Sequence, residues 1–192
     1  MNDAQQTRMI RLCQKGHSDG FVLLLKEYGP RLYGFFVRTG MSAADAEDMI
    51  QELFLRLLKR IRNYRHSGRF EQWLFRVAAN LVRDEYRRRR RAGPMISLAN
   101  DSDDPDVSHV VPPSPEPGPE SRYCRIEQRD QLSRVLQELP SMDREIIMLR
   151  HYGQLSFREI AEQFDIPIGT ALAKVHRGLK KLRRSIEQDE SE

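Results

Sequence analysis

Apolar side chains in the first half of the chain recur every three or four residues, the spacing of a helix that buries one face. The first run consists of Phe21, Leu24, Leu25, Tyr28, Leu32 and Phe35. The second consists of Met49, Ile50, Leu53, Phe54, Leu57, Leu58 and Ile61. The third consists of Phe70, Trp73, Leu74, Val77, Ala78, Leu81 and Val82. Because no segment alternates as a strand does, the pattern predicts a helical bundle.

Capping residues indicate where these helices begin. Ser18 or Asp19 can cap the first helix, which is expected to bend where Gly29-Pro30 interrupts it. Ser42 and Asp45 form a capping-box-like start for the second helix, with aspartate in place of the usual glutamate.

The second half of the chain shows the same period in shorter segments. Its inward positions are expected to be Leu132, Val135, Leu136, Leu139, Ile146, Ile147, Leu149, Ile160, Ala161 and Phe164. Pro140 stops the first of these helices, Ser141 is expected to cap the next, and Gly153 ends it. Ser156 and Glu159 form a capping box that starts a short third helix.

A tight turn at 165–167 separates this short helix from a long basic one that runs from about Ile168 to Ser185. The core positions of the long helix are expected to be Ala171, Val175, Gly178 and Leu182. The outward positions are then Thr170, Lys174, Arg177, Lys180 and Lys181. This order is the helix-turn-helix pattern, whose second helix enters the major groove of DNA. An ordinary solvated, lysine-rich face is the alternative.

The two helical halves are separated by a segment of different composition. Between 101 and 120 the chain has six acidic residues, six of its ten prolines and no Lys or Arg. Proline and like charge disfavour helix and burial, so this segment is predicted to be a linker. The expected organisation is an all-α fold of two small helical domains, at 1–96 and 122–192, joined by an acidic, proline-rich linker at 97–121.

Composition argues against several classes of protein. Of the 192 residues, 39% are hydrophobic and 31% are charged, and no run approaches the roughly 18 apolar residues of a membrane span. The N-terminus lacks an apolar signal core, so a cytoplasmic protein is expected. Cys13 and Cys124 belong to no Cys/His cluster, which argues against a disulfide framework or a zinc site.

Residue spacings that would indicate catalysis are not found. Asp45, Glu47, Asp48 and Glu52 could be imagined as metal ligands, but their place near a helix start explains their charge. The histidines have no Cys, Ser or carboxylate at a spacing that forms a site, and there is no glycine-rich phosphate loop. We therefore expect no enzyme activity, no cofactor and no bound metal.

Positive charge is concentrated in two blocks. Six arginines lie between 83 and 91, and six Lys or Arg residues lie between 174 and 184 without an acid. Two such blocks on either side of an acidic segment predict two surfaces for a polyanion. Asn80, one turn before the first block, can hydrogen-bond a base edge; a polar surface residue is the alternative.

The second predicted helix has an unusual outer face, formed by Asp48, Gln51, Glu52, Leu55 and Arg56. An exposed leucine among acids and amides suggests a contact with another protein. A leucine that is exposed for no functional reason is the alternative.

Several motifs carry a family resemblance. AEDMIQELF at 46–54 and FEQWLFRVAAN at 70–80 resemble region 2 of the extracytoplasmic-function sigma factors. Leu139-Pro140, SFREIA at 156–161, IGT at 168–170 and His176-Arg177 resemble region 4 of the same family. The likeness covers most of the chain, and the two regions in this order are a specific signal.

The resemblance implies a dissociable subunit of bacterial RNA polymerase that directs promoter recognition. It implies docking on the coiled coil of the polymerase beta-prime subunit by Asp48, Gln51, Glu52 and Leu55, with a further contact to the beta flap. It assigns the minus-ten element, with one base flipped into a pocket, to Arg65, His66, Ser67, Arg69, Asn80, Arg83 and Arg87. It assigns the minus-35 element to Thr170, Leu172, Lys174, His176, Arg177, Lys180 and Lys181. Core polymerase, promoter DNA and an anti-sigma factor are the implied partners.

This chain departs from the family between Thr170 and His176, where polar or basic residues usually read the DNA. Leu172 and Ala173 occupy two of these positions, and Leu179 replaces a commonly charged residue. Apolar side chains contact thymine methyl groups but cannot form a bidentate pair with guanine. The minus-35 sequence therefore cannot be transferred from relatives.

Two other functions stay open from the sequence. One is a helix-turn-helix regulator that acts without polymerase, and the other is a decoy that occupies polymerase or an anti-sigma factor without initiating. For the linker, the resemblance implies a path through the polymerase active-site cleft and RNA exit path, where acidic side chains would occupy a basic channel. A solvated spacer is the alternative.

Overall fold

The computed structural model describes residues 2–91 and 132–189. Its elements are α1 (Asp3–Gln14), α2 (Ser18–Arg38), α3 (Ala43–Arg60), the 3₁₀ turn η1 (Ile61–Asn63), α4 (Phe70–Arg91), α6 (Ser141–Tyr152), α7 (Phe157–Phe164) and α8 (Ile168–Asp189). Residues 132–137 are also helical, and none of the described residues lies in a strand, which confirms the all-α prediction. The predicted linker at 97–121 and Cys124 lie outside the described residues.

The first bundle, α1 to α4, buries most of the predicted inward positions. These are Leu24, Tyr28, Leu32, Phe35, Leu53, Leu57, Ile61, Phe70, Leu74, Val77, Ala78, Leu81 and Val82. Leu25 and Leu58 were wrongly predicted to face inward, because their side chains are 48% and 46% exposed. Each follows a buried leucine and is turned about 100° further round its helix, beyond the face that packs.

α1 is a helix that the apolar pattern does not predict. Asn2 and Gln5 form a capping box at its start, and Met9, Ile10 and Cys13 are its buried residues. These apolar side chains are too few to show a helical period in the sequence, and the structure shows them packed against α2. Burial raises the pKa of the Cys13 thiol to about 11, so this thiol is not a nucleophile at neutral pH.

Two helix starts differ from the prediction. α2 begins at Ser18 itself, and its N-cap residue is His17, whose side chain makes no capping hydrogen bond. Ser141 is likewise the first residue of α6, and the N-cap residue is Pro140. A serine that already has helical backbone angles lies one position too late to act as the cap.

Both predicted capping boxes form. The Ser42 hydroxyl accepts from the backbone N–H of Asp45, and the Ser156 hydroxyl accepts from that of Glu159. α2 runs as one helix from Ser18 to Arg38, with Pro30 inside it.

The second bundle consists of residues 132–137, α6, α7 and α8. Its predicted core is confirmed at Val135, Leu136, Leu139, Ile146, Ile147, Leu149, Ile160 and Ala161, which are buried. The four predicted core positions of α8, including Gly178, are buried as well. A Cβ atom at Gly178 would overlap the Ile147 side chain, so glycine lets α8 approach α6 closely.

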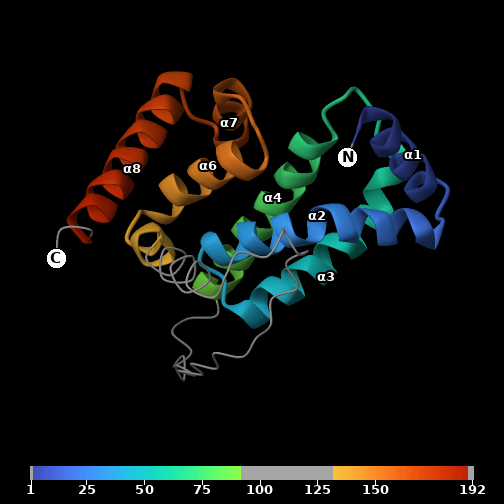
Figure 1. Cartoon of the computed structure of the whole chain (residues 1–192), viewed down its shortest axis with the longest axis horizontal. Helices are drawn as coiled ribbons and strands as arrows, with labels where there is room; N and C mark the ends of the chain where they lie inside the picture. Colours follow the sequence, from blue (N-terminus) through green and yellow to red (C-terminus); the bar gives the residue numbers. More distant parts are fainter. Residues whose placement is uncertain (1, 92–131, 190–192) are drawn as a thin grey trace, which may run out of the picture.

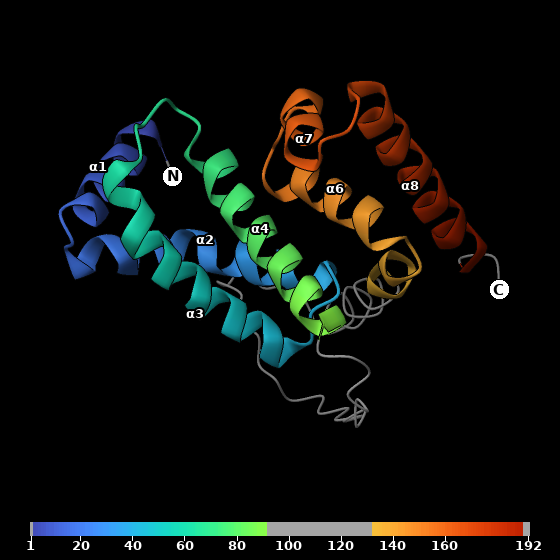
Figure 2. The same ribbon diagram turned by 180° about the vertical axis from the view of Figure 1, so that it is seen from behind.

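α6 packs against α2 and α4 and so joins the two bundles. In Figure 1 and from behind in Figure 2, α6 and α7 lie between α4 on one side and α8 on the other. The ring of Tyr152, at the end of α6, lies 6.3 Å from the Phe75 ring and 6.4 Å from the Phe35 ring. Arg31 pairs with Glu71 at 2.8 Å and donates to the Tyr152 carbonyl oxygen at 2.7 Å.

Candidate nucleic-acid and protein-binding surfaces

The loop that precedes α4 is held in place by aromatic side chains. The ring of Tyr64 lies 4.6 Å from that of Trp73 and 5.5 Å from that of Phe70. Gln14 of α1 donates to the Tyr64 carbonyl oxygen at 2.7 Å. Of the loop residues predicted to contact the minus-ten element, Arg65, Ser67 and Arg69 are exposed and His66 is half-buried.

α4 carries the remaining predicted minus-ten residues on one stripe. Arg76, Asn80, Arg83 and Arg87 follow each other at spacings of four, three and four, so they share one side of the helix. Asn80 and Arg87 are exposed. Arg76 lies on the same stripe, four residues before Asn80, but is not among the predicted minus-ten residues.

Arg83 does not face solvent. Its Nε atom lies 2.9 Å from Oε1 of Glu145 on α6, and its Nη1 atom donates to the Gln163 carbonyl oxygen at 3.1 Å. Its guanidinium carbon lies 4.2 Å from the centroid of the Phe164 ring. The side chain is 23% exposed, and the second bundle therefore covers it.

Two further arginines, one on this stripe and one in the preceding loop, meet a single acid of the second bundle. Arg76 lies 3.1 Å from Glu159 of α7, and Arg69 of the loop lies 3.7 Å from the same carboxylate oxygen. Although burial opposes it, the pKa of Glu159 is lowered by hydrogen bonds from Ser156 and by the charges of Arg76 and Arg69. Glu159 is therefore ionised at neutral pH.

Glu145 has the opposite electrostatic balance. Its side chain is only 8% exposed. Burial raises the pKa of this carboxyl group to about 7, although the charge and hydrogen bond of Arg83 act to lower it. A carboxyl group that is costly to ionise thus lies directly against a DNA-contact candidate.

The end of the arginine block is paired within the first bundle. Arg88 and Arg89 each approach Glu85 to 2.7 Å, and Arg89 also lies 2.7 Å from Asp45. Hydrogen bonds from Arg88 and Arg89 lower the pKa of the buried Glu85 carboxyl. The pairs with Glu85 lie within α4, and the pair of Arg89 with Asp45 joins the end of α4 to the start of α3.

α8 presents a different surface. Of the predicted minus-35 residues, Leu172, His176, Arg177, Lys180 and Lys181 are exposed. Thr170 is half-buried, and so is Lys174, whose Nζ atom lies 2.5 Å from Asp143 of α6. Ile168 is 53% exposed and lies one turn before Leu172. The sequence prediction for this surface included Leu172 but not Ile168.

The outer face of α3 is accessible. Asp48 and Gln51 are exposed, and the Leu55 side chain is 56% exposed. Glu52 accepts from Arg56 at 2.9 Å, and Arg56 also reaches Asp84 of α4 at 2.9 Å. Leu58 adds a second exposed leucine one turn beyond Leu55.

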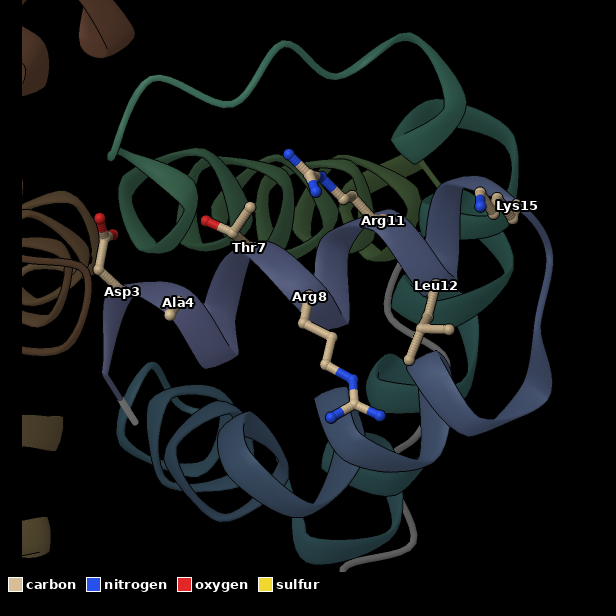
Figure 3. A pocket seen from close by; sticks show the side chains of 7 residues that line it. All are labelled: Asp3, Ala4, Thr7, Arg8, Arg11, Leu12 and Lys15. Carbon is tan, nitrogen blue, oxygen red and sulfur yellow. The ribbon is translucent and has the colours of Figure 1, made fainter.

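A hollow on α1 lies apart from these surfaces. Figure 3 shows its lining, which consists of Asp3, Ala4, Thr7, Arg8, Arg11, Leu12 and Lys15. None of these residues belongs to a predicted site. In the described part of the chain no three His, Cys, Asp or Glu residues are grouped to hold a metal ion, and no helix is long and apolar enough to cross a membrane.

Comparison with known proteins assigns both bundles to one family. Residues 24–92 match sigma-70 region 2, and residues 129–182 match sigma-70 region 4. The chain is 31% identical to the RNA polymerase sigma factor CarQ of Myxococcus xanthus, over 92% of this chain and 95% of CarQ.

Another relative and a solved structure are also sigma factors. The ECF RNA polymerase sigma factor SigE of Mycolicibacterium smegmatis is 32% identical over 88% of this chain, which spans 62% of the length of SigE. The fold resembles that of the sigma factor RpoE of Bartonella quintana, solved with the anti-sigma factor NepR, with a TM-score of 0.61 and 21% identity over 87% of this chain and 96% of that one. The chain belongs to the extracytoplasmic-function group of the sigma-70 family of RNA polymerase sigma factors.

Proposed function

We propose that this chain binds bacterial core RNA polymerase and directs it to promoters. The observation that carries the proposal is that regions 2 and 4 occur in order in one chain and each has an accessible face of the expected chemistry. α3 offers an apolar and acidic face for a protein, and α8 offers a basic face for DNA. Membership of the family favours this function over a regulator that acts without polymerase.

Run-off transcription with purified bacterial core polymerase tests the function directly. The DNA immediately upstream of the gene for this chain is the first template, because self-regulated promoters are common in the family. A transcript that depends on the chain supports the proposal. Core binding without a transcript on any template would instead identify a decoy, and DNA binding without core binding would identify a regulator.

For the polymerase contact we propose the face formed by Asp48, Gln51, Glu52, Leu55 and Leu58, docked on the beta-prime coiled coil. Leu55→Asp combined with Gln51→Ala should weaken binding to core and leave the far-UV circular dichroism unchanged, because these side chains are exposed in the free chain. Leu23→Asp is the matched control, since Leu23 of α2 is 45% exposed. Unimpaired binding by the double variant would remove this face from the proposal.

For the minus-ten element we propose the exposed loop at 65–69 together with Asn80, Arg83 and Arg87. Asn80→Ala should change the preference at one position of the element by about 1–3 kcal/mol, because an amide that reads a base edge acts on one base pair. A uniform loss on all promoters would reassign Asn80 to positioning.

For the minus-35 element we propose the exposed residues of α8, with region 4 also contacting the beta flap. Leu172 and Ile168 favour thymine methyl groups over guanine, while Arg177 and Lys180 supply phosphate contacts. An anti-sigma factor stays a predicted partner.

A further inference from the structure

α1 carries a basic face that none of the surfaces proposed above includes. This α1 basic face consists of Arg8, Arg11 and Lys15, which follow each other at spacings of three and four and so lie on one side of the helix. All three residues are exposed. Between Ala4 and Lys15 the helix contains no acidic residue. The match to sigma-70 region 2 begins at residue 24, so α1 lies outside the matched part of the chain.

The three cations of the α1 basic face have no ion-pair partner among the described residues. Other arginines of the first bundle do find acids, since Arg31 lies 2.8 Å from Glu71 and Arg56 lies 2.9 Å from Asp84. The lining of the hollow on α1 includes all three cations of the face (Figure 3). Exposed cations that are not paired within their own fold are available to an anion from outside.

The loop of the minus-ten surface is attached to α1. The helix packs against η1, and Gln14 donates to the carbonyl oxygen of Ile61 at 3.3 Å and to that of Tyr64 at 2.7 Å. Tyr64 immediately precedes Arg65, which is exposed. In Figure 3 the Arg11 side chain points toward the side of α1 on which this loop runs. The α1 basic face is therefore next to the minus-ten surface and continues it beyond the loop.

The position of α1 also indicates which part of the promoter reaches it. α1 and α8 lie at opposite ends of the molecule, both in Figure 1 and from behind in Figure 2. The proposed function assigns the minus-35 element, which lies upstream of the minus-ten element, to α8. A strand that leaves the minus-ten surface at the loop, on the side away from α8, therefore runs downstream and passes α1. In an open promoter this stretch of DNA is single-stranded.

We propose that Arg8, Arg11 and Lys15 bind the phosphates of the melted promoter strand immediately downstream of the minus-ten element. The inference rests on the proposed function, because it takes α4 and the loop at 65–69 to hold that element. The three cations span about 10 Å along the helix axis, so they can contact successive phosphates. Since contacts to phosphates carry no base information, α1 adds affinity for the open promoter and no preference for a sequence.

Arg8→Ala combined with Arg11→Ala tests this contact in the holoenzyme. Both side chains are exposed, so the double variant should keep its fold. Lys26→Ala combined with Arg134→Ala is the matched control, because it removes the same charge at exposed residues outside every proposed surface. Two partly single-stranded templates are made from the promoter that gives a run-off transcript. In one the single strand ends at the minus-ten element, and in the other it continues to the start site.

The double variant and its control are expected to differ only on the longer template. There the double variant should lower the slope of log K against log salt concentration by about 1.4, because each phosphate contact of a single strand contributes about 0.7. Between 1 M and 0.1 M salt this change amounts to about 25-fold in affinity. On the shorter template both variants should bind as the wild type does.

Three results would overturn the inference. A wild-type salt slope of the double variant on the longer template would show that α1 makes no phosphate contact. An equal loss on both templates would place the contact at the minus-ten element itself, and weaker binding to core polymerase without DNA would make this face a protein contact. Failure of the proposed function looks different, because the wild-type chain then gives no run-off transcript with core polymerase.

Discussion

α4 and α8 are both 22-residue helices with an apolar stripe and a cluster of basic residues, yet these basic side chains have different surroundings. On α4, Arg83 is covered by α6 and α7, and Arg88 and Arg89 are paired with Glu85. On α8, Arg177 and Lys180 are exposed. The comparison shows that a basic block in a sequence indicates the partner it can bind, while the tertiary arrangement decides whether it is accessible.

The difference follows from the position of each helix. α4 packs against α3 on one side and against α6 on another. α8 packs against α6 and α7 and lies at the edge of the molecule (Figure 1). Buried residues therefore lie on two faces of α4, including Phe75, and on one face of α8. A helix between two bundles meets acids from both of them.

The two helices are expected to differ most in how far a substitution lowers the free energy of unfolding. Phe75→Ala should lower the free energy of unfolding by about 3–5 kcal/mol, because the ring is fully buried against Phe35 and Tyr152. Leu172→Ala on α8 should change it by less than about 0.5 kcal/mol. Urea denaturation of both variants measures this, and equal losses would show that α8 is also packed on its outer face.

Lys174 and Lys180 sharpen the comparison within α8. Lys174→Ala should destabilise the second bundle by about 2 kcal/mol, because it leaves the half-buried Asp143 without its charged partner. Lys180→Ala should leave stability unchanged and reduce the salt slope of DNA binding by about one. Thermal unfolding and DNA titrations at several salt concentrations test the two variants. If Lys174→Ala instead lowered the salt slope and left stability unchanged, Lys174 would be a DNA contact.

The contact between α4 and α6 should depend on pH through Glu145. The pKa of its carboxyl group is about 7 when buried and 4.5 in its ordinary state. Between pH 4.5 and 7 the folded chain therefore binds more protons than the unfolded chain. The contribution of this group to stability is therefore highest below pH 4.5, falls between pH 4.5 and about 7, and levels off above that. Between pH 6 and 8 the loss should be about 1 kcal/mol. Glu145→Gln should remove this dependence in denaturation curves, and an unchanged curve would mean that Glu145 is not buried in solution.

Arg87 of α4 is exposed, as Arg177 and Lys180 of α8 are, and its substitution should have the smallest effect on stability. Its side chain is 70% exposed and lies 4.0 Å from Asp84. Arg87→Ala should change the free energy of unfolding by less than about 0.5 kcal/mol. It should weaken transcription from all promoters alike and lower the salt slope by about one. A loss confined to one promoter would show base readout instead.

Local chemistry accounts for most of what could be predicted. The 3.6-residue period located the helices, and the Ser42 and Ser156 capping boxes formed because their hydrogen bonds join residues only three apart. The core face of α8 was also predictable, since Ala171, Val175 and Leu182 follow the period. Leu25 and Leu58 were wrong because the width of a buried face depends on which helices lie beside it.

The sequence by itself determined the helices other than α1, the family, and the chemical nature of the residues proposed to bind DNA and protein, because these depend on neighbours along the chain and on motif order. Only the tertiary structure decided that Arg83 meets Glu145, that Phe75 packs against Tyr152 and that Lys174 pairs with Asp143. Each of the first two pairs joins residues more than 60 positions apart, and no local periodicity encodes which side of one helix faces another.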